Sequence, residues 1–316
     1  MKSRHHLPHY RIAVVGSGAV GSYYGARLAE FGREVHFLIR SGLEQVKRFG
    51  LRIKSRQGNV FVPKVHCHAS TADIGPVDLV LIALKSTDNS ALETLIPPLL
   101  KPGTMLLTLQ NGLGNEEYLA ERFGTERVLG GLCFVCLNRE TPGLVHHLSQ
   151  GHVILGEFSG YPLPRTLEVQ WEFKRCGVPC TVSASLGEAR WRKLAWNVPF
   201  NGLPILSGGK DVARILADED LSYLARRILD EVIGAARVLG HAIPTSFADT
   251  LIQRTREMGP YRPSSLLDFE SGRAVEVESI WGEPYRRAFN AGAECGRMEM
   301  LYHQIRHLIG ERVHLN

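Results

Sequence analysis

The strongest indication of fold in this 316-residue chain is Arg11-Ile-Ala-Val-Val-Gly-Ser-Gly-Ala-Val-Gly21. A short β-branched run leads directly into three glycines spaced G-x-G-x-x-G, and a helical pattern follows as far as Phe31. This order of strand, glycine turn and helix is typical of a dinucleotide-binding unit, in which the glycines permit a tight turn, approach of the pyrophosphate and close helix packing. At the helix N-terminus we therefore predict a phosphate-binding turn made of Gly16, Ser17, Gly18, Ala19, Val20 and Gly21.

The strand expected next, Glu34-Val-His-Phe-Leu-Ile39, ends at Arg40, where such folds recognise the adenosine ribose. A protein that selects NAD commonly places Asp or Glu at this point to bind the ribose 2′-hydroxyl. A guanidinium suits a 2′-phosphate instead, so Arg40 predicts NADPH/NADP+ as the cofactor. The alternative is that Arg40 is an ordinary exposed arginine.

Two further runs have the continuous apolar character of buried parallel strands, Asp78-Leu-Val-Leu-Ile-Ala-Leu84 and Thr104-Met-Leu-Leu-Thr-Leu109. Lys85 follows the first run, and Asn111 lies just beyond the second. Ligands of open α/β sheets bind beside the carboxyl ends of the strands. We therefore expect Lys85 and Asn111 to form a lip over the cofactor, the alternative being that each is an ordinary loop residue.

The sequence changes character near residue 184. Before it, strand-like runs dominate, with a hairpin predicted over 51–65, strands over 128–137, 144–148 and 152–155, and a helix over 167–174. After it, helical periodicity predicts helices over 186–200, 221–239, 247–257, 280–293 and 298–309. The predicted fold class is α/β, with a Rossmann-type dinucleotide-binding domain over 1–183 and an all-helical substrate and catalytic domain over 184–316.

A polar stripe marks the first of these helices, Arg190-Trp-Arg-Lys-Leu-Ala-Trp-Asn-Val-Pro-Phe-Asn201. Lys193, Asn197 and Asn201 recur every fourth residue, so they lie on one face of a mostly apolar helix. A solvated face is the general alternative, but such faces usually mix Glu, Lys and Arg. Two short amides beside a single lysine favour a binding site, and Pro199 is expected to kink the helix next to it.

Bulk properties narrow the classes of function. The net charge of +5 comes without a basic block, so no nucleic-acid partner is expected, and no apolar run approaches the length of a membrane span. Residues 1–10 are basic and are followed by apolar residues, so this segment superficially resembles a signal peptide. The glycine motif accounts better for those apolar residues, and a cytoplasmic protein is therefore expected. No second Cys or His pair completes a zinc pattern around the six cysteines, so no metal is expected.

Taken together, these motifs resemble the ketopantoate reductase (2-dehydropantoate 2-reductase) family. The resemblance runs in the family's order over nearly the whole chain. It is carried by the glycine turn, Arg40, Leu84-Lys85, Gln110-Asn111-Gly112, Trp191-Arg-Lys-Leu-Ala-Trp-Asn197 and the segment 264–278. Without the resemblance, that last segment would be interpreted as a helix cap followed by surface charges. The resemblance implies NADPH-dependent reduction of a small 2-oxo acid, 2-dehydropantoate, in pantothenate and coenzyme A biosynthesis. A homodimer is compatible with these features.

The resemblance also implies a role for each matching residue. Lys193 would donate the proton to the keto oxygen, with Glu276 beside it as the second catalytic residue and a contact to substrate or cofactor. Asn197 and Asn201 would hold the hydroxyl and carboxylate end of the substrate, and one serine of the pair Ser264 and Ser265, which we expect to be Ser265, would bind the carboxylate. Asn111 would contact both ligands, and Lys85 and Arg40 would contact NADPH.

Three departures keep other hypotheses open. First, many members of the family have Asn-Pro-Leu-Thr where this chain has Asn201-Gly-Leu-Pro204. Second, the stretch between the serine pair and Asp268 is slightly shorter than is usual in the family. Third, Trp281 stands at a position where Asn is common. All three fall in the half expected to recognise substrate, so a reductase of another branched or aromatic 2-oxo acid is one alternative. A non-catalytic NADP-binding sensor or scaffold is another, although it would need none of Lys193, Asn197, Asn201 and Glu276 at these spacings.

Overall fold

The structure is a computed structural model that describes residues 10–315 of the chain. Residues 1–9, which belong to the segment compared with a signal peptide, lie outside the described residues. The chain divides into two compact units. The first unit comprises the residues up to Gln110 together with Asn115–Leu186, and the second comprises Asn111–Gly114 together with the chain from Gly187 onward. The division thus falls three residues after the expected boundary, and the short loop Asn111–Gly114 groups with the second unit.

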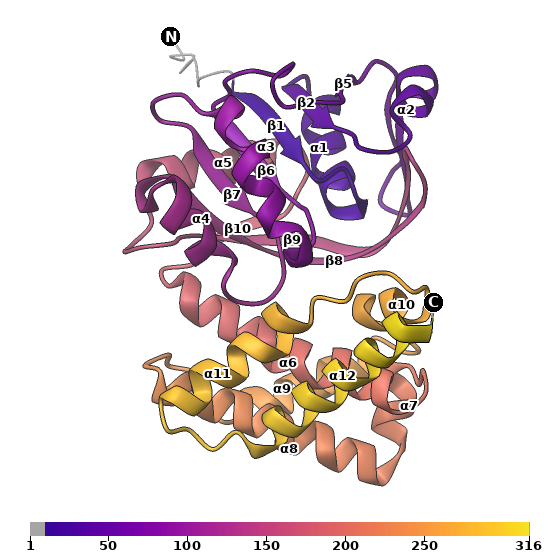
Figure 1. The fold of residues 1–316 in the computed structure, drawn as a ribbon, viewed down its shortest axis with the longest axis vertical. Helices are drawn as coiled ribbons and strands as arrows, with labels where there is room; N and C mark the ends of the chain where they lie inside the picture. Colours follow the sequence, from indigo (N-terminus) through magenta and orange to yellow (C-terminus); the bar gives the residue numbers. More distant parts are fainter. Residues whose placement is uncertain (1–9, 316) are drawn as a thin grey trace. The chain divides into compact units, whose positions relative to one another are not determined.

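The first unit is built on a mixed sheet in the order β4-β3-β9-β8-β7-β6-β1-β2-β5, with β10 paired to β9 (Figure 1). Strands β2, β1, β6, β7 and β8 run parallel to one another, as the buried apolar runs predict, and β8 pairs with β9 in the antiparallel direction. The hairpin expected over 51–65 is present as antiparallel β3 and β4. The strand bounds are β1 Arg11–Val15, β2 Glu34–Leu38, β3 Leu51–Ser55, β4 Val60–Val62, β5 His66–His68, β6 Leu79–Ile82, β7 Met105–Thr108, β8 Val128–Thr141, β9 Leu144–Glu157 and β10 Cys180–Val182.

The long hairpin β8–β9 corrects the strands predicted over 144–148 and 152–155. These two runs form one continuous strand. Gly151, at φ 121°, has no partner on β8, because Val135 pairs with Gln150 and Phe134 pairs with His152. A β-bulge of this kind interrupts the alternation of side chains without ending the strand, which is why the sequence suggests two strands. β8 also extends beyond its predicted end, to Thr141.

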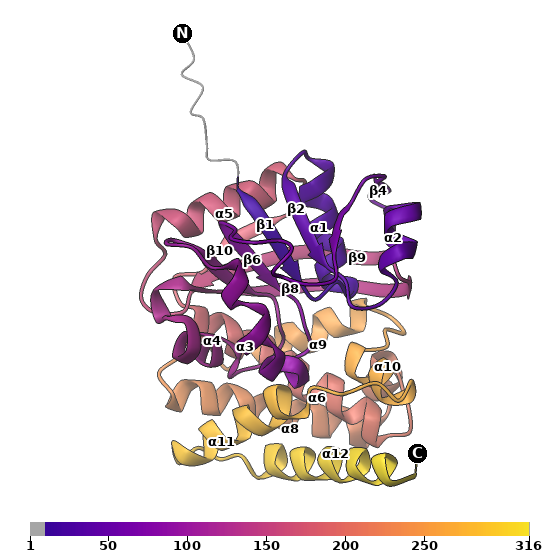
Figure 2. The ribbon, with the colours of Figure 1, turned by 45° about the horizontal axis from the view of Figure 1, so that its top comes forward.

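Helices cover both faces of this sheet, as Figure 2 shows. Ile12 and Val14 of β1 pack with α1 (Ala19–Glu30) and α5 (Pro164–Arg175) on one face. Ala13 and Val15 point the other way and pack with α3 (Leu92–Leu95) and α4 (Asn115–Phe123). This strict alternation on an apolar strand is what a sheet buried on both faces requires. The remaining helices of the unit are α2 Leu43–Phe49 and the 3₁₀ turns η1 Ser86–Ala91, η2 Pro97–Leu99 and η3 Thr125–Arg127.

The described part of the second unit is helical, which confirms the predicted fold class. Its core joins Trp191, Leu194 and Val198 of α6 to the apolar faces of α8 and α12, which lie side by side in Figure 2. The elements are α6 Leu186–Leu206, α7 Val212–Ala217, α8 Glu219–Val238, α9 Phe247–Glu257, α10 Ser264–Glu270, the π-helix η4 Glu278–Gly282, α11 Glu283–Asn290 and α12 Gly296–Leu315. Among the described residues, no helix is both long and apolar enough to cross a membrane.

Helix α6 differs from its prediction, which ended it at Phe200. The helix continues through Pro199 and Pro204 as far as Leu206. A proline in a helix removes one backbone hydrogen bond and costs about 3 kcal/mol. Phe200, Leu203 and Ile205 are nevertheless all buried in the core of the second unit. We attribute the continuation of the helix to this packing, which outweighs the local cost of the prolines.

Candidate active site

The glycine turn has the geometry that the spacing predicts. Gly16 has φ +105°, and a Cβ there would lie 2.4 Å from the backbone nitrogen of Leu84. A Cβ on Gly21 would lie 2.2 Å from the carbonyl oxygen of Gly16. A Cβ on Gly18, by contrast, would meet no heavy atom within 4 Å. The first and third glycines are therefore required by the fold itself, whereas the second leaves open space in front of the backbone.

That open space lies at the N-terminus of α1. Gly18 is the N-cap residue, no side chain caps the helix, and its first turn contains no acidic residue. The first N–H groups of such a helix have no partner within the helix and carry the positive end of the helix dipole. The Ser17 hydroxyl donates to the carbonyl of Leu38 at 2.7 Å, so the turn is also tied to the end of β2. The turn therefore fits the pyrophosphate of a dinucleotide.

Arg40 lies two residues beyond the end of β2 and is exposed. Within residues 10–315, its guanidinium makes neither a hydrogen bond nor an ion pair, so its charge is not neutralised by a neighbouring carboxylate. An arginine in this state can bind an anion without first breaking a salt bridge. The structure thus provides what the NADPH prediction requires at this position, and the contact itself stays a prediction.

Lys85 and the residues after β7 lie at two neighbouring strand ends, because β6 and β7 pair in parallel with Ile82 opposite Thr108. A chain of polar side chains, which the sequence analysis missed, fixes these ends. The Thr108 hydroxyl donates to Gln110 Oε1 at 2.9 Å, and Gln110 Nε2 donates to Asn89 Oδ1 at 2.7 Å. Asn89 Nδ2 in turn donates to Asn115 Oδ1 at 3.0 Å. The only signal in the sequence was their position after buried strands.

In the second unit, Lys193 of α6 meets Asn111. Lys193 Nζ donates to Asn111 Oδ1 at 2.7 Å, although the two residues are 82 positions apart in the chain. The loop that carries Asn111 is anchored by the next two residues. The amide of Leu113 donates to the carbonyl of Ser279 at 2.9 Å, and Gly112 has φ +83° with no room for a Cβ beside Ser279. A half-buried ammonium is therefore held in a fixed direction by a neutral amide.

The two asparagines of the stripe have different surroundings. Asn201 Nδ2 donates to the carbonyl of Asn197 at 3.1 Å, and the amide of Ser265 donates to Asn201 Oδ1 at 3.4 Å. Both ends of the Asn201 amide are thus engaged, and its oxygen caps the N-terminus of α10. The Asn197 side chain is also buried, with 6% exposed, but no described residue hydrogen-bonds to its amide. Asn197 is therefore the residue of this pair whose amide is available to a ligand.

The segment over 264–278 is more than a cap and surface charges. Ser264 and Ser265 are the first two residues of α10, and Pro263 takes the N-cap position, so neither serine caps the helix. Ser265 is buried, whereas Ser264 is exposed. Glu276 is half-buried and precedes the π-helix η4, and its carbonyl accepts the amide of Ile280 at 3.1 Å. π-Helical turns are frequent at functional sites.

Two of the residues at which the second unit departs from the family pattern, Trp281 and Gly202, have structural explanations. Trp281 is buried, and its indole nitrogen donates to the carbonyl of Val198 at 2.9 Å. A Cβ on Gly202 would lie 2.9 Å from the side chain of Leu301, so a glycine is needed for α6 to pack against α12. Both departures from the family pattern therefore serve packing within the second unit. Trp281 gives no reason to expect an aromatic substrate.

The cysteines are apolar core residues. All six are free, and five of them are buried. Burial raises the pKa of the Cys176 and Cys180 thiols to about 12, which keeps them protonated at neutral pH. Among the residues that the structure describes, no group of three or more His, Cys, Asp or Glu side chains is arranged to hold a metal ion.

The predicted site residues thus separate into two sets. The glycine turn, Arg40 and Lys85 belong to the first unit, and the second unit contains Asn111, Lys193, Asn197, Asn201, Ser265 and Glu276. The first set offers backbone N–H groups and cations, as an anionic dinucleotide requires. The second offers one ammonium together with neutral amides, a hydroxyl and the Glu276 carboxylate, which suits protonation of an oxygen on a small carboxylate substrate.

Comparison with known proteins identifies the family of the chain. The family model described as ketopantoate reductase PanE/ApbA matches residues 12–160, and the model for its C-terminal part matches residues 185–309. The chain is 37% identical over 305 residues to a 2-dehydropantoate 2-reductase of Nostoc sp., with 95% of both chains covered.

Solved structures lead to the same family. A 2-dehydropantoate 2-reductase from Geobacter metallireducens GS-15 has a TM-score of 0.91 at 44% identity, covering 96% of this chain and 99% of that one. The corresponding enzyme from Methylococcus capsulatus has a TM-score of 0.86 at 31% identity, covering 94% and 96%. From its sequence and its fold alike, this chain belongs to the ketopantoate reductase family PanE/ApbA.

Proposed function

We propose that this chain catalyses the NADPH-dependent reduction of 2-dehydropantoate to pantoate, a step of pantothenate and coenzyme A biosynthesis. The observation that carries the proposal is the contact of Lys193 Nζ with Asn111 Oδ1 at 2.7 Å. Such a contact orients an ammonium without neutralising it. A non-catalytic nucleotide-binding protein would have no need of an ammonium held in this way.

When bound, NADPH supplies the hydride that reduces the keto carbon. Lys193 donates a proton to the substrate oxygen, and its positive charge stabilises the negative charge that develops there. An ammonium has three N–H donors, and Asn111 fixes the direction of one of them. Glu276 is half-buried beside the π-helix η4 of the same unit, and we assign it to orienting the substrate or the cofactor.

Substrate binding falls to the neutral groups of the second unit. We assign direct contact with the substrate's hydroxyl and carboxylate end to Asn197, whose amide has no described partner, and to the Ser265 hydroxyl. Asn201 would contribute by holding the first turn of α10, which carries Ser265, in place. Neutral donors bind the oxygens of a carboxylate without competing with Lys193 for the negative charge.

Cofactor binding falls to the first unit. The backbone N–H groups at the start of α1 would hold the pyrophosphate in the space in front of Gly18. Arg40 would bind the 2′-phosphate, and Lys85 would contact the cofactor from the end of β6. We further propose a cytoplasmic location, supported by the six free cysteines, and a homodimer, since two-fold dimers are the commonest oligomers.

Turnover of NADPH with a panel of 2-oxo acids tests the proposal. The absorbance of NADPH would be followed with 2-dehydropantoate and, in parallel, with smaller, larger branched and aromatic 2-oxo acids. We expect the highest kcat/KM with 2-dehydropantoate. A higher value with another acid would preserve the reaction and replace the substrate. Tight NADPH binding without oxidation by any of the acids would contradict the proposal and favour a sensor.

A further inference from the structure

We propose that Arg139 is a second arginine that selects NADPH over NADH, by binding the adenosine 2′-phosphate beside the glycine turn. This inference deepens the proposed function, since it takes the dinucleotide site of that function as given. Arg139 lies near the end of β8, about a hundred residues after Arg40 in the chain, and no motif in the sequence pointed to it.

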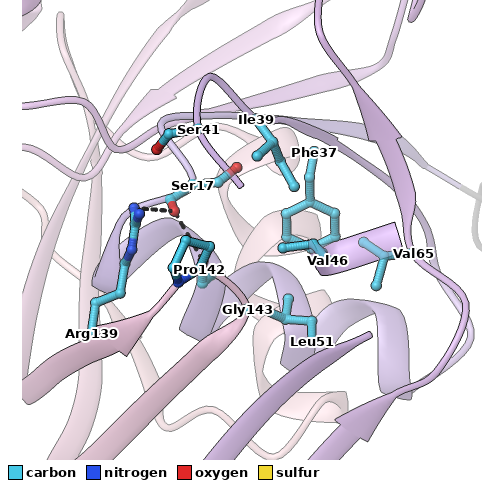
Figure 3. Close-up of a pocket in the computed structure, with 11 residues that line it drawn as sticks. Ser17, Phe37, Ile39, Ser41, Val46, Leu51, Val65, Arg139, Pro142 and Gly143 are labelled. Atoms are coloured by element: carbon cyan, nitrogen blue, oxygen red, sulfur yellow. Dashed lines mark hydrogen bonds between the residues drawn. The ribbon is translucent and has the colours of Figure 1, made fainter. Parts of the chain in front are cut away.

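The position of Arg139 is defined by a contact with the glycine turn. Its Nη1 donates to the carbonyl oxygen of Ser17 at 3.2 Å, as drawn in Figure 3. Arg139, Ser17 and Ser41 line one pocket, whose wall also includes Ile39. Ile39 and Ser41 are the two neighbours of Arg40 in the chain. The remaining lining residues are mostly apolar, and the polar ones come from the phosphate-binding turn, α1, the segment after β2 and Arg139.

The tip of the hairpin that carries Arg139 is held firmly against this region. A Cβ on Gly42, the residue after Ser41, would lie 2.2 Å from the Cβ of Pro142, so chain segments distant in sequence are in close contact there. The amide of Arg52 donates to the carbonyl of Gly143 at 2.8 Å, and β3 continues the contact by pairing with β9. Because the hairpin tip is anchored on two sides, Arg139 does not depend on a mobile loop for its place.

The positive charge of Arg139 at this pocket is not balanced by an acidic residue in the described part of the chain. In the described part of the chain, neither Arg139 nor Arg40 forms an ion pair. The acidic residue next to Arg139, Glu140, pairs with His146 at 2.6 Å, and Glu44 of the nearby α2 pairs with Lys47 at 3.0 Å. The Arg139 guanidinium, which has no acidic partner, lines one pocket with Ser41, whose hydroxyl adds a donor for a phosphate dianion, and Arg40 adds a second positive charge one residue before Ser41. A neutral ribose 2′-hydroxyl would have no need of either charge.

Direct binding measurements on the purified full chain test the inference without relying on turnover. The dissociation constants of NADPH and NADH would be measured by fluorescence, and those of adenosine 2′,5′-bisphosphate and 5′-AMP by calorimetry. For Arg139→Ala we expect NADPH and the 2′,5′-bisphosphate to bind roughly tenfold more weakly, because one charge-assisted hydrogen bond is lost at an exposed site. NADH and 5′-AMP should bind within about twofold of the unmodified chain, and Arg139→Lys should lie between the two.

A matched control comes from Arg48, whose guanidinium lies over its neighbour Phe49 rather than in the pocket. Arg48→Ala removes the same charge from the same unit and should leave the ratio of NADPH to NADH affinity unchanged. An unchanged ratio in Arg139→Ala would overturn the inference. So would an equal loss for both cofactors, since it would mean that Arg139 acts only by supporting the Ser17 carbonyl.

The outcome is separable from that of the proposed function. If no 2-oxo acid is reduced but Arg139→Ala weakens the 2′,5′-bisphosphate alone, the reductase proposal fails and the role of Arg139 stands. If 2-dehydropantoate is reduced but the preference between the two cofactors is insensitive to Arg139, the reductase proposal stands and the role of Arg139 fails.

Discussion

The glycine turn of the first unit and the polar stripe on α6 of the second make their sites in opposite ways. In the turn, the constraints are local and act on the backbone: Gly21 is pressed against Gly16, only five residues earlier. In the stripe, the working groups are side chains, and their partners come from far along the chain. Lys193 meets Asn111 across 82 positions, and Asn201 meets Ser265 across 64.

From this difference we expect the two regions to respond differently to substitution. In the glycine turn, a Cβ cannot be added at Gly16 or Gly21, where backbone segments are in contact, but there is space for one at Gly18, where the ligand is expected. A stripe made of side chains can lose a group without unfolding, provided that the group faces the ligand rather than its own neighbours.

Lys193→Ala should lower kcat by roughly three orders of magnitude or more, because the proton donor and the charge that stabilises the transition state are lost together. The dissociation constant of NADPH should stay nearly unchanged, since Lys193 is assigned to the substrate oxygen and not to the cofactor. Lys210→Ala is the matched control: Lys210 is a lysine of the same unit that pairs with Asp218 at 2.9 Å, and its loss should leave kcat intact. Full activity in Lys193→Ala would remove the basis for a catalytic stripe.

Gly21→Ala and Gly18→Ala should separate the two kinds of glycine in the turn. At Gly21 the new Cβ would lie 2.2 Å from a backbone oxygen, so we expect a loss of about 1–3 kcal/mol in the free energy of unfolding. Gly18→Ala should unfold at the same denaturant concentration as the unmodified chain but bind NADPH more weakly. Denaturant titration and cofactor binding measure the two effects. Equal destabilisation by both substitutions would contradict the distinction between them.

Asn201→Ala and Asn197→Ala should separate the two amides of the stripe. Loss of Asn201 removes the acceptor of the Ser265 amide, so the free energy of unfolding should fall by about 1–3 kcal/mol. Asn197→Ala should leave that stability nearly unchanged and raise KM for the 2-oxo acid. If Asn197→Ala proves the more destabilising of the two, the division between a ligand-facing and a structural amide is wrong.

The smallest effect concerns acid stability. Burial is the main cause that lowers the pKa of His36 and of His68 below the ordinary 6.5, and the two rings meet at 2.9 Å on the β2–β5 edge of the first unit. The unfolded chain then binds more protons than the folded one, so stability is lost as the pH falls below 6.5. Amide hydrogen exchange of β2 and β5 at neutral and mildly acidic pH should detect this loss.

His36→Gln provides the comparison for that measurement. It removes one of the two rings, so exchange in β2 and β5 should depend less on pH than in the unmodified chain. In the second unit only His241 has a pKa lowered in this way among the described residues, so the amides of α8 should respond less to acid. Loss of protection in α8 before β2 would contradict the prediction.

Much of the fold could be predicted from the sequence because its signals are local. The period of apolar residues placed the parallel strands, and it gave α9 its observed ends at Phe247 and Glu257. The predictions failed where distant packing overrides local preference. β9 continues past Gly151 because its partner strand stays paired, and α6 continues past Pro199 because the core of the second unit surrounds it.

The same division applies to the candidate site. The glycine turn, the arginine after β2 and the shared face of Lys193, Asn197 and Asn201 could all be predicted from the sequence, since each follows from chain geometry over a few residues. Three contacts depend on the folded structure: Asn111 orients Lys193, Asn201 supports Ser265 while Asn197 stays available, and Arg139 reaches Ser17. Backbone spacing sets which side chains share a face. Which distant groups these side chains contact depends on how the strands and helices pack, and a local sequence pattern contains no information about that packing.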